Sequence, residues 1–286
     1  MRQYSIQTTG IVGLLAFLFT ACSSESPVDN GSQEQELVIS AEIIPSGESK
    51  ALGAPANGIE KLAFTNNDLI SITRSDKSRV YKLTDKRWLP EQGGDELAVD
   101  GTSQKYTAIY PSGFTGILAD QHDNTGDKYT QSNKLISEVT TTSNYIPFKF
   151  GHAFAKITIV VAYKTNSQRK NVTVKLVGGN IRTSDGTGDE TIKMLRTMPE
   201  DNTLSVSHTF ICILNPGEAR GFTLTVSGTT SDDNQAADEK YTQASRVFKA
   251  GNNYIYNFSS NDNLILNGVT VAGFDEGGKN DVGNAT

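Results

Sequence analysis

The feature that most limits the fold of this chain is a series of short segments in which apolar and polar residues alternate. Breaks rich in Gly, Pro, Asn and Ser separate these segments, as at 111–113 and 250–253. Side chains two residues apart share one face of a strand, so the alternation predicts strands with one buried face. Strands are expected at 37–44, 68–74, 80–83, 104–110, 146–149, 151–163, 172–177, 204–214, 222–227, 254–258 and 264–271.

Little of the sequence suits a helix. One short helix is expected at 131–139, and no long segment is amphipathic at a period of 3.6 residues. Many short strands with turn residues between them are typical of β-sandwiches, so the predicted fold class is all-β. At roughly 100–200 residues per domain, a chain of 286 residues favours two sandwiches over one.

The N-terminus has the pattern of an export signal. Residues 11–21 form an apolar run that is too short for a membrane span of roughly 20 residues. The sequence LFTA before Cys22 resembles a bacterial lipobox, with Phe19 where Leu is usual. The resemblance implies a lipoprotein signal peptide at 1–21 and a mature chain that begins at lipidated Cys22. An ordinary secretory signal with an incidental cysteine is the alternative. Residues 22–36 are polar and acidic, which predicts a flexible tether.

Charge and motifs argue against several classes of function. The net charge is −6 and no long block of one sign occurs, which argues against nucleic-acid binding. The chain has no HExxH, CxxC, GxSxG or GxxxxGK[ST] motif and no candidate acid–base pair. The only other cysteine, Cys212, lies in an apolar strand pattern and is expected to be a small buried hydrophobe. The sequence therefore indicates no enzyme, no cofactor and no metal.

Two features leave a binding alternative open. His122 stands among Asp120, Asp123 and Asp127, which can hold a cation loosely, but their spacing departs from the EF-hand pattern and favours a solvated loop. Trp88 is either a platform for stacking on a glycan or an anchor in the core or at a sheet edge, and the second interpretation is favoured.

Five segments carry a resemblance to a known family. They are, in chain order, 67–72 (NDLISI), 106–111 (YTAIYP), 120–121 (DQ) with 129–135 (YTQSNKL), 148–157 (FKFGHAFAKI) and 248–257 (FKAGNNYIYN). Together they resemble the fimbrillin family, the pilus subunits of type V fimbriae, over nearly the whole exported body. Phe274 stands where the family usually has Trp, and Lys50-Ala51 stands where Arg-Ala is common.

This resemblance implies two tandem transthyretin-like β-sandwich domains after the signal peptide and tether. The segment at 148–157 resembles the opening of the second domain, which places the boundary near Tyr145, with domains at 37–145 and 146–286 and a polar tail at the end. The implied function is a structural or adhesive subunit of a cell-surface fimbria, exported as a lipid-anchored precursor to the outer membrane. The implied partners are other fimbrial subunits, an Arg/Lys-specific maturation protease and a host or bacterial surface receptor.

The implied assembly mechanism is strand replacement. A protease removes the first strand, and a strand from the next subunit fills the groove. Lys50 lies in a Pro/Gly/Ser-rich loop and is the candidate cleavage site, with an ordinary loop lysine as the alternative. The apolar residues of the removable strand are Leu37, Ile39, Ala41 and Ile43, and those of the candidate donor strand are Leu264, Leu266, Val269 and Val271.

Two alternatives to this mechanism stay open at the level of the sequence. Residues 264–271 can equally be the closing strand of their own domain, with a bulge at Gly268, where the alternation is broken. The whole chain can instead be a glycan-binding outer-membrane lipoprotein of a nutrient-uptake system. That function requires exposed aromatic platforms, and the single Trp counts against it.

Overall fold

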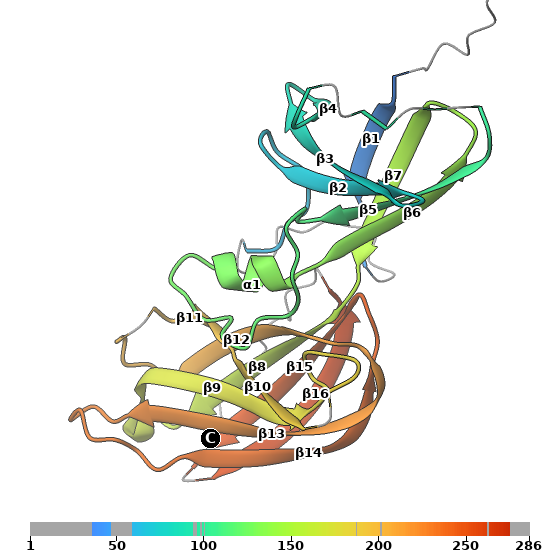
Figure 1. The fold of residues 1–286 in the computed structure, drawn as a ribbon. Coiled ribbons are helices and arrows are strands. Elements are labelled where there is room, and N and C mark those ends of the chain that lie inside the picture. The colour runs from blue at the N-terminus through green and yellow to red at the C-terminus, as the bar shows by residue number, and fades with distance from the viewer. Residues whose placement is uncertain are drawn as a thin grey trace, which may run out of the picture. The chain divides into compact units, whose positions relative to one another are not determined.

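The structure is a computed structural model that describes residues 36–46, 59–93, 96, 97, 99, 101–186, 188–200, 202–261 and 263–274. These residues form sixteen strands, one short α-helix (α1, Asp127–Ser132) and one 3-10 turn (η1, Thr165–Ser167). The predicted all-β class is confirmed, and the sheets have a sandwich-like arrangement (Figure 1). No helix in the described part of the chain is long and apolar enough to span a membrane.

The first half of the chain forms a seven-stranded sheet in the order β1-β7-β6-β5-β2-β3-β4. Its strands are β1 (Val38–Ile43), β2 (Leu69–Arg74), β3 (Lys77–Thr84), β4 (Arg87–Pro90), β5 (Gln104–Tyr110), β6 (Leu135–Thr141) and β7 (Tyr145–His152). Alternate residues such as Ile70, Ile72, Tyr106 and Phe148 face inward and are buried in one apolar core. The end strands β1 and β4 contact each other, which shows that the sheet is curled.

The second half contains a four-stranded and a five-stranded sheet, whose orders are β10-β9-β13-β14 and β11-β12-β8-β15-β16. The first consists of β9 (Lys170–Gly179), β10 (Asp189–Lys193), β13 (Gly217–Thr229) and β14 (Glu239–Phe248). The second consists of β8 (Ala155–Tyr163), β11 (Leu195–Met198), β12 (Ser207–Leu214), β15 (Asn252–Ser260) and β16 (Leu264–Gly273). Their inner faces share a second apolar core, which includes Ile159, Val174, Phe210 and Tyr256.

The chain changes sheet between β7 and β8, at Ala153 and Phe154. β7 pairs with β1 and β6, whereas β8 lies between β12 and β15. This change of sheet comes later in the chain than the boundary expected near Tyr145. The number of domains and the boundary between them remain predictions.

The helix expected at 131–139 is wrong, because α1 lies earlier in the chain. α1 ends at Ser132, and the following residues form β6, in which Leu135 and Ser137 are buried on one face. The short alternation in β6 is the stronger signal, because β6 pairs with β5 over its whole length.

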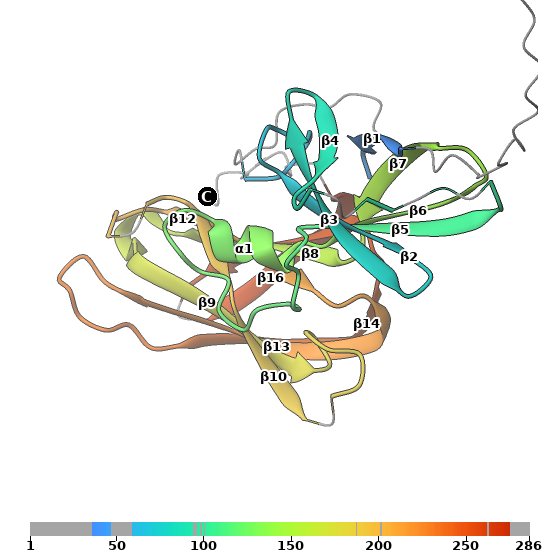
Figure 2. The same cartoon turned by 45° about the horizontal axis from the view of Figure 1, so that its top comes forward.

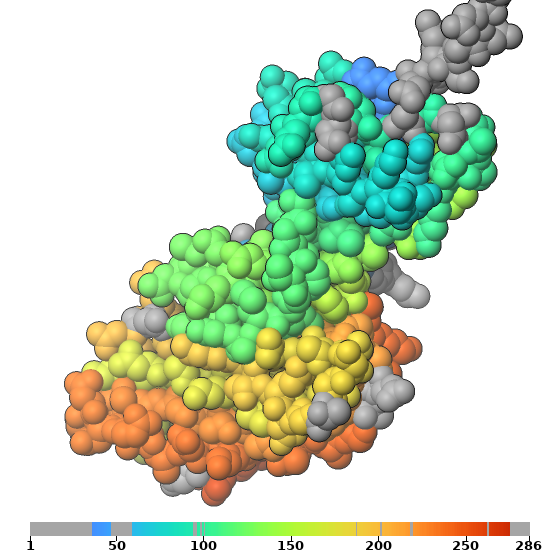
Figure 3. All heavy atoms as spheres, in the orientation of Figure 1, coloured from blue at the N-terminus to red at the C-terminus, as the bar shows by residue number. Residues whose placement is uncertain are grey.

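A segment between β5 and α1 acts as a further strand partner for the second half. The backbone of Lys193 donates to the carbonyl of Ala119 at 2.7 Å, and Gln121 N donates back to Lys193 O at 2.9 Å. The buried Gln121 amide then pairs with both polar groups of the Ile213 backbone: Nε2 donates to the carbonyl at 2.9 Å, and the Ile213 N–H donates to Oε1 at 2.8 Å. Figure 3 shows this green segment directly against the gold segment of β10.

A close approach of β9 and β13 depends on Gly178. A Cβ at this position would lie 2.6 Å from the backbone oxygen of Gly221, closer than real Cβ atoms come to other atoms. Gly178→Ala is therefore expected to lower the free energy of unfolding by about 1–3 kcal/mol, measured by urea denaturation. Gly179→Ala is the matched control, because no atom lies within 4 Å of the added carbon. Equal stability of the two variants would contradict this prediction.

Candidate functional site

The first strand lies at an edge of its sheet. β1 pairs in parallel with β7, with Val38 opposite Tyr145 and Ile43 opposite Phe150 (Figures 1 and 2). Its predicted inward residues do face the core: Leu37, Ile39 and Ile43 are buried, and Ala41 packs against the same cluster. Its outward residues Val38, Ser40, Glu42 and Ile44 are exposed. β1 therefore has one apolar face in the core and one face in solvent.

Few polar interactions hold β1 in place. One backbone ladder joins it to β7, and it is framed by Val38 N donating to Asn144 O at 2.8 Å and Ile44 N donating to Phe150 O at 2.9 Å. An exposed ion pair between Glu42 and Lys149, 3.5 Å apart, crosses the same two strands. Exposed ion pairs contribute little to stability, so the buried apolar side chains are the main attachment of β1.

β7 separates from β6 along most of its length. The two strands pair only at Leu135 with His152 and at Ile136 with Gly151. Farther along, the Lys149 N–H donates instead to the Ser137 side chain at 2.9 Å. An open cavity of about 590 Å³ lies at this separation, lined in part by Ile44, Ile136, Val139 and Pro147. The pair of β1 and β7 is thus joined to the rest of the sheet by a short stretch of ladder.

The candidate donor strand is β16, which forms the other edge of the five-stranded sheet, next to β15. Leu264 is buried, and Leu266 and Val269 are partly buried against the second core. Val271 differs from these three, because 47% of its surface is exposed. The ladder shifts register where Gly268 and Leu266 meet consecutive residues of β15, which is the position of the expected bulge. In this structure β16 closes its own sheet.

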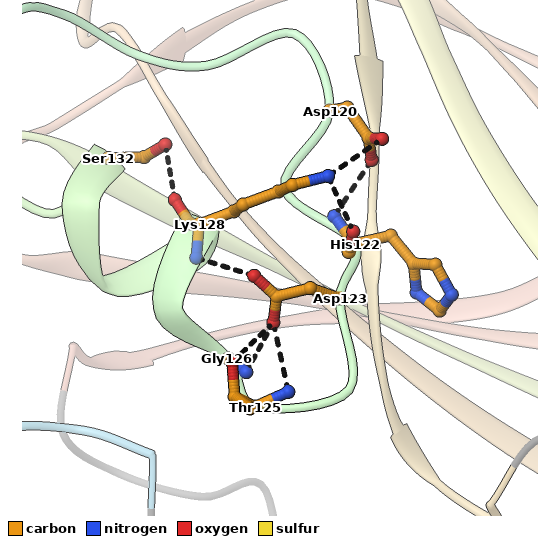
Figure 4. A network of polar contacts seen from close by, with 7 residues as sticks. All are labelled: Asp120, His122, Asp123, Thr125, Gly126, Lys128 and Ser132. Atoms are coloured by element: carbon orange, nitrogen blue, oxygen red, sulfur yellow. Dashed lines mark hydrogen bonds and ion pairs between the residues drawn. The ribbon is translucent and has the colours of Figure 1, made fainter.

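The carboxylate of Asp123 binds backbone N–H groups at the start of α1. Its Oδ1 accepts the backbone N–H groups of Thr125, at 3.1 Å, and of Gly126 (Figure 4). Its Oδ2 accepts the N–H of Lys128 at 2.7 Å. Partial burial raises the pKa of Asp123, but these donors and the positive charge of Lys128 outweigh it and leave the pKa below its usual range. Asp123 therefore satisfies backbone groups at a helix start.

The neighbouring carboxylate is held in a similar way. Asp120 accepts the backbone N–H of His122 at 3.0 Å and the Lys128 ammonium at 3.2 Å. Figure 4 shows the His122 imidazole pointing away from both carboxylates. Asp127 accepts the Thr125 hydroxyl at 2.7 Å. The loop thus uses its carboxylates internally, and no group of three or more His, Cys, Asp or Glu side chains in the described part is placed to hold a metal ion.

The remaining sequence candidates lie in the interior. Trp88 is 6% exposed, and its ring meets that of Phe64 edge-on, with the centroids 5.3 Å apart. Trp88 is therefore a core anchor, which is the interpretation that the sequence favoured. Cys212 is buried as expected, and burial raises the pKa of its thiol, which leaves it unreactive. Cys22 and Lys50 lie outside the described residues.

Two functional candidates escaped the sequence analysis. Gln121, within the DQ segment, has no sequence signal that marks it as a buried contact. Glu60 follows a Pro- and Gly-rich stretch and carries no motif. Glu60 pairs with Lys156 at 2.7 Å in the interior. The available signal was Lys156, a charged residue inside an otherwise apolar strand, because such a residue requires a buried partner.

Comparison with known proteins locates the fold. No protein-family model matches the sequence, and no curated protein matches it. The structure of a candidate cell adhesion protein from Bacteroides ovatus aligns with a TM-score of 0.60 at 18% identity, covering 84% of this chain and 98% of that one. A candidate cell adhesion protein from Bacteroides uniformis aligns with a TM-score of 0.52 at 14% identity, covering 84% and 99%. At these identities, the shared property is the fold along nearly the whole length of both relatives.

Proposed function

We propose that this protein is a structural or adhesive subunit of a cell-surface fimbria that assembles by strand replacement. The observation that carries the proposal is the setting of β1, an edge strand whose apolar face fills the core while one ladder joins it to the sheet. The same fold in two candidate cell adhesion proteins supports a surface role. In the proposed pathway, the chain reaches the outer membrane as a precursor with lipid on Cys22, and a protease cuts after Lys50.

Loss of β1 would leave a site for another strand. The β7 backbone groups that now face β1 would lose their partners, and an apolar trough would open where Leu37, Ile39 and Ile43 now lie. Burial of each such side chain is worth about 1.5–3 kcal/mol, so the opened core is strongly stabilised by a substitute. An edge with unpaired N–H and C=O groups beside an apolar trough is a template for strand addition.

The proposed substitute is β16 of the next subunit. Leu264, Leu266 and Val269 supply large apolar side chains on an edge strand, and the fourth candidate, Val271, is already exposed. An edge strand has one neighbour to leave, here β15, so its transfer disrupts a single ladder. Donation therefore requires β16 to come away from β15. The partners of the chain in this pathway are other fimbrial subunits and the maturation protease, with a surface receptor for an adhesive subunit.

The test is the N-terminus and assembly state of the native surface material. Intact mass and an unboiled gel would be measured on protein taken from the cell surface. A chain that begins after Lys50, or after a nearby basic residue, within a detergent-resistant ladder supports the proposal. A monomer that still begins at lipidated Cys22 would refute it and favour an anchor or glycan-binding lipoprotein.

Lys50→Ala is expected to abolish polymer growth. The protease needs a basic residue at the cut, so the first strand would stay in place and the chain would accumulate as a folded, lipidated monomer. Lys50→Arg is the matched control, because it keeps the charge that an Arg/Lys-specific protease recognises, and it should polymerise normally. The measurement is the series of polymer bands that each variant gives on an unboiled gel. A normal series from Lys50→Ala would show that Lys50 is not the cleavage site.

A further inference from the structure

A buried ion pair joins two distant parts of the chain. The Lys156 ammonium lies 2.7 Å from Glu60 Oε1, and the two side chains are 4% and 1% exposed. The Tyr129 hydroxyl donates to the same oxygen at 2.8 Å, while Glu60 Oε2 has no hydrogen-bond partner among the described residues. Removing two charges from water is costly, so such a pair is weak evidence for stability and instead suggests a role in fixing one arrangement.

That arrangement holds the residue that follows β16. The ring of Phe274 is fully buried and stacks on His152, with the centroids 3.6 Å apart and the planes 13° from parallel. The Lys156 ammonium lies 5.0 Å from the centre of the same ring, within the range of a cation–π interaction. The Phe274 N–H donates to the carbonyl of Gly251 at 2.9 Å. We call Glu60, His152, Lys156 and Phe274 the Phe274 clasp.

The clasp also meets both ends of the segment that contains Lys50. Glu60 follows that segment closely, and Ser46 precedes it. The Ser46 Cβ lies 3.4 Å from the position that a Cβ on Gly251 would occupy, beside the residue that accepts the Phe274 N–H. The end of the candidate donor strand therefore lies near both flanks of the candidate cleavage segment, near Ser46 through Gly251 and near Glu60 through Lys156.

We propose that the Phe274 clasp is a latch that holds β16 in its own sheet and releases it when the N-terminal segment changes. The rest of β16 is an edge strand with a single ladder, to β15, and that ladder is irregular near Gly268. Loss of β1 with the residues up to Lys50 would take Ser46 away from Gly251 and leave a new chain end shortly before Glu60. The trigger and the purpose of this release rest on the proposed function, whereas the hold of the clasp on β16 does not.

The test is hydrogen exchange of the full-length monomer in wild type and variants. Phe274→Ala is expected to raise the exchange of amides in β16 about 100-fold relative to amides in β13, because it removes the one large side chain that anchors the strand end. Glu60→Gln is expected to raise the same ratio about 10-fold, although Glu60 does not belong to β16. Ile265→Ala is the matched control on the same strand, since its side chain is 54% exposed, and it should leave the ratio unchanged.

Further variants keep the proposal open to refutation if Glu60→Gln loosens the whole fold. The double variant Glu60→Gln with Lys156→Met leaves no buried charge unpaired and should still raise β16 exchange relative to β13. A uniform rise over all strands in the double variant, or no rise in either Glu60→Gln or the double variant, would refute the latch. Because exchange is measured on the monomer, this result is independent of polymerisation. An unpolymerised native protein with the expected exchange pattern would refute the fimbrial function and leave the latch standing.

Discussion

Between pH 6.5 and pH 4, the free energy of unfolding is expected to fall by about 3 kcal/mol through His208 alone. The His208 side chain is fully buried on β12, and its Nε2 donates to the Arg169 carbonyl at 3.0 Å. Burial is the main cause that lowers the pKa of His208 to about 4, and the positive charge of Arg196 acts in the same direction. The rings of Tyr163 and Phe210 lie against the imidazole.

The direction follows from the two pKa values. In the unfolded chain, His208 binds a proton near pH 6.5, whereas in the folded chain it stays neutral until about pH 4. Its contribution to stability is therefore fully present above pH 6.5 and is lost as the pH falls toward 4. Urea denaturation at several pH values measures this loss. His208→Gln should remove the His208 share of the pH dependence, while the loop variant His122→Gln should keep it. Identical pH profiles for His208→Gln and wild type would contradict the prediction.

Gln121→Glu is expected to lower the free energy of unfolding by about 3 kcal/mol at neutral pH. The amide now donates to the carbonyl of Ile213 and, at 3.3 Å, to that of Leu118. A carboxylate cannot donate, so two carbonyl oxygens would face a buried negative charge. Burial would raise the pKa of the new carboxyl, so the loss should shrink as the pH falls toward the pKa of the unfolded state, about 4.3.

Low pH restores a donor, because a protonated carboxyl can pair with the Ile213 backbone much as the amide does. The pH dependence caused by Gln121→Glu is thus opposite in sign to that of His208. Gln131→Glu, an exposed position on α1, is the control and should change stability little. A loss in Gln121→Glu that does not vary with pH would show that the amide does not make the predicted buried contacts in solution.

The strands that could be read from the sequence are those whose pattern is local. The alternation from Leu37 to Ile43 fixed both the strand and its buried face, since each inward residue is two positions from the next. The burial of Cys212 followed from an unbroken apolar run, which is typical of a strand covered on both faces.

The rest depends on partners far along the chain. Glu60 and Lys156 meet only in the folded protein, and nothing near Glu60 in the sequence distinguishes it from a surface carboxylate. Gln121 and Ile213 are also far apart in the sequence and meet only in the folded protein. The exposure of Val271 depends on the register of β16 against β15, which the irregularity near Gly268 shifts and which alternation alone does not reveal.

Because β7 pairs with β6 at only two residues, hydrogen exchange of the β7 amides can report whether a strand occupies the position of β1. In a parallel ladder, alternate residues bond to opposite sides, so the N–H groups of Ile146, Phe148 and Phe150 face β1. On the other side, Pro147 has no N–H and that of Lys149 is taken by Ser137. Protection of those three amides from exchange therefore shows, residue by residue, whether a strand of any origin occupies the position of β1. A subunit that has lost β1 and gained no other strand would be recognised by the rapid exchange of these amides alone.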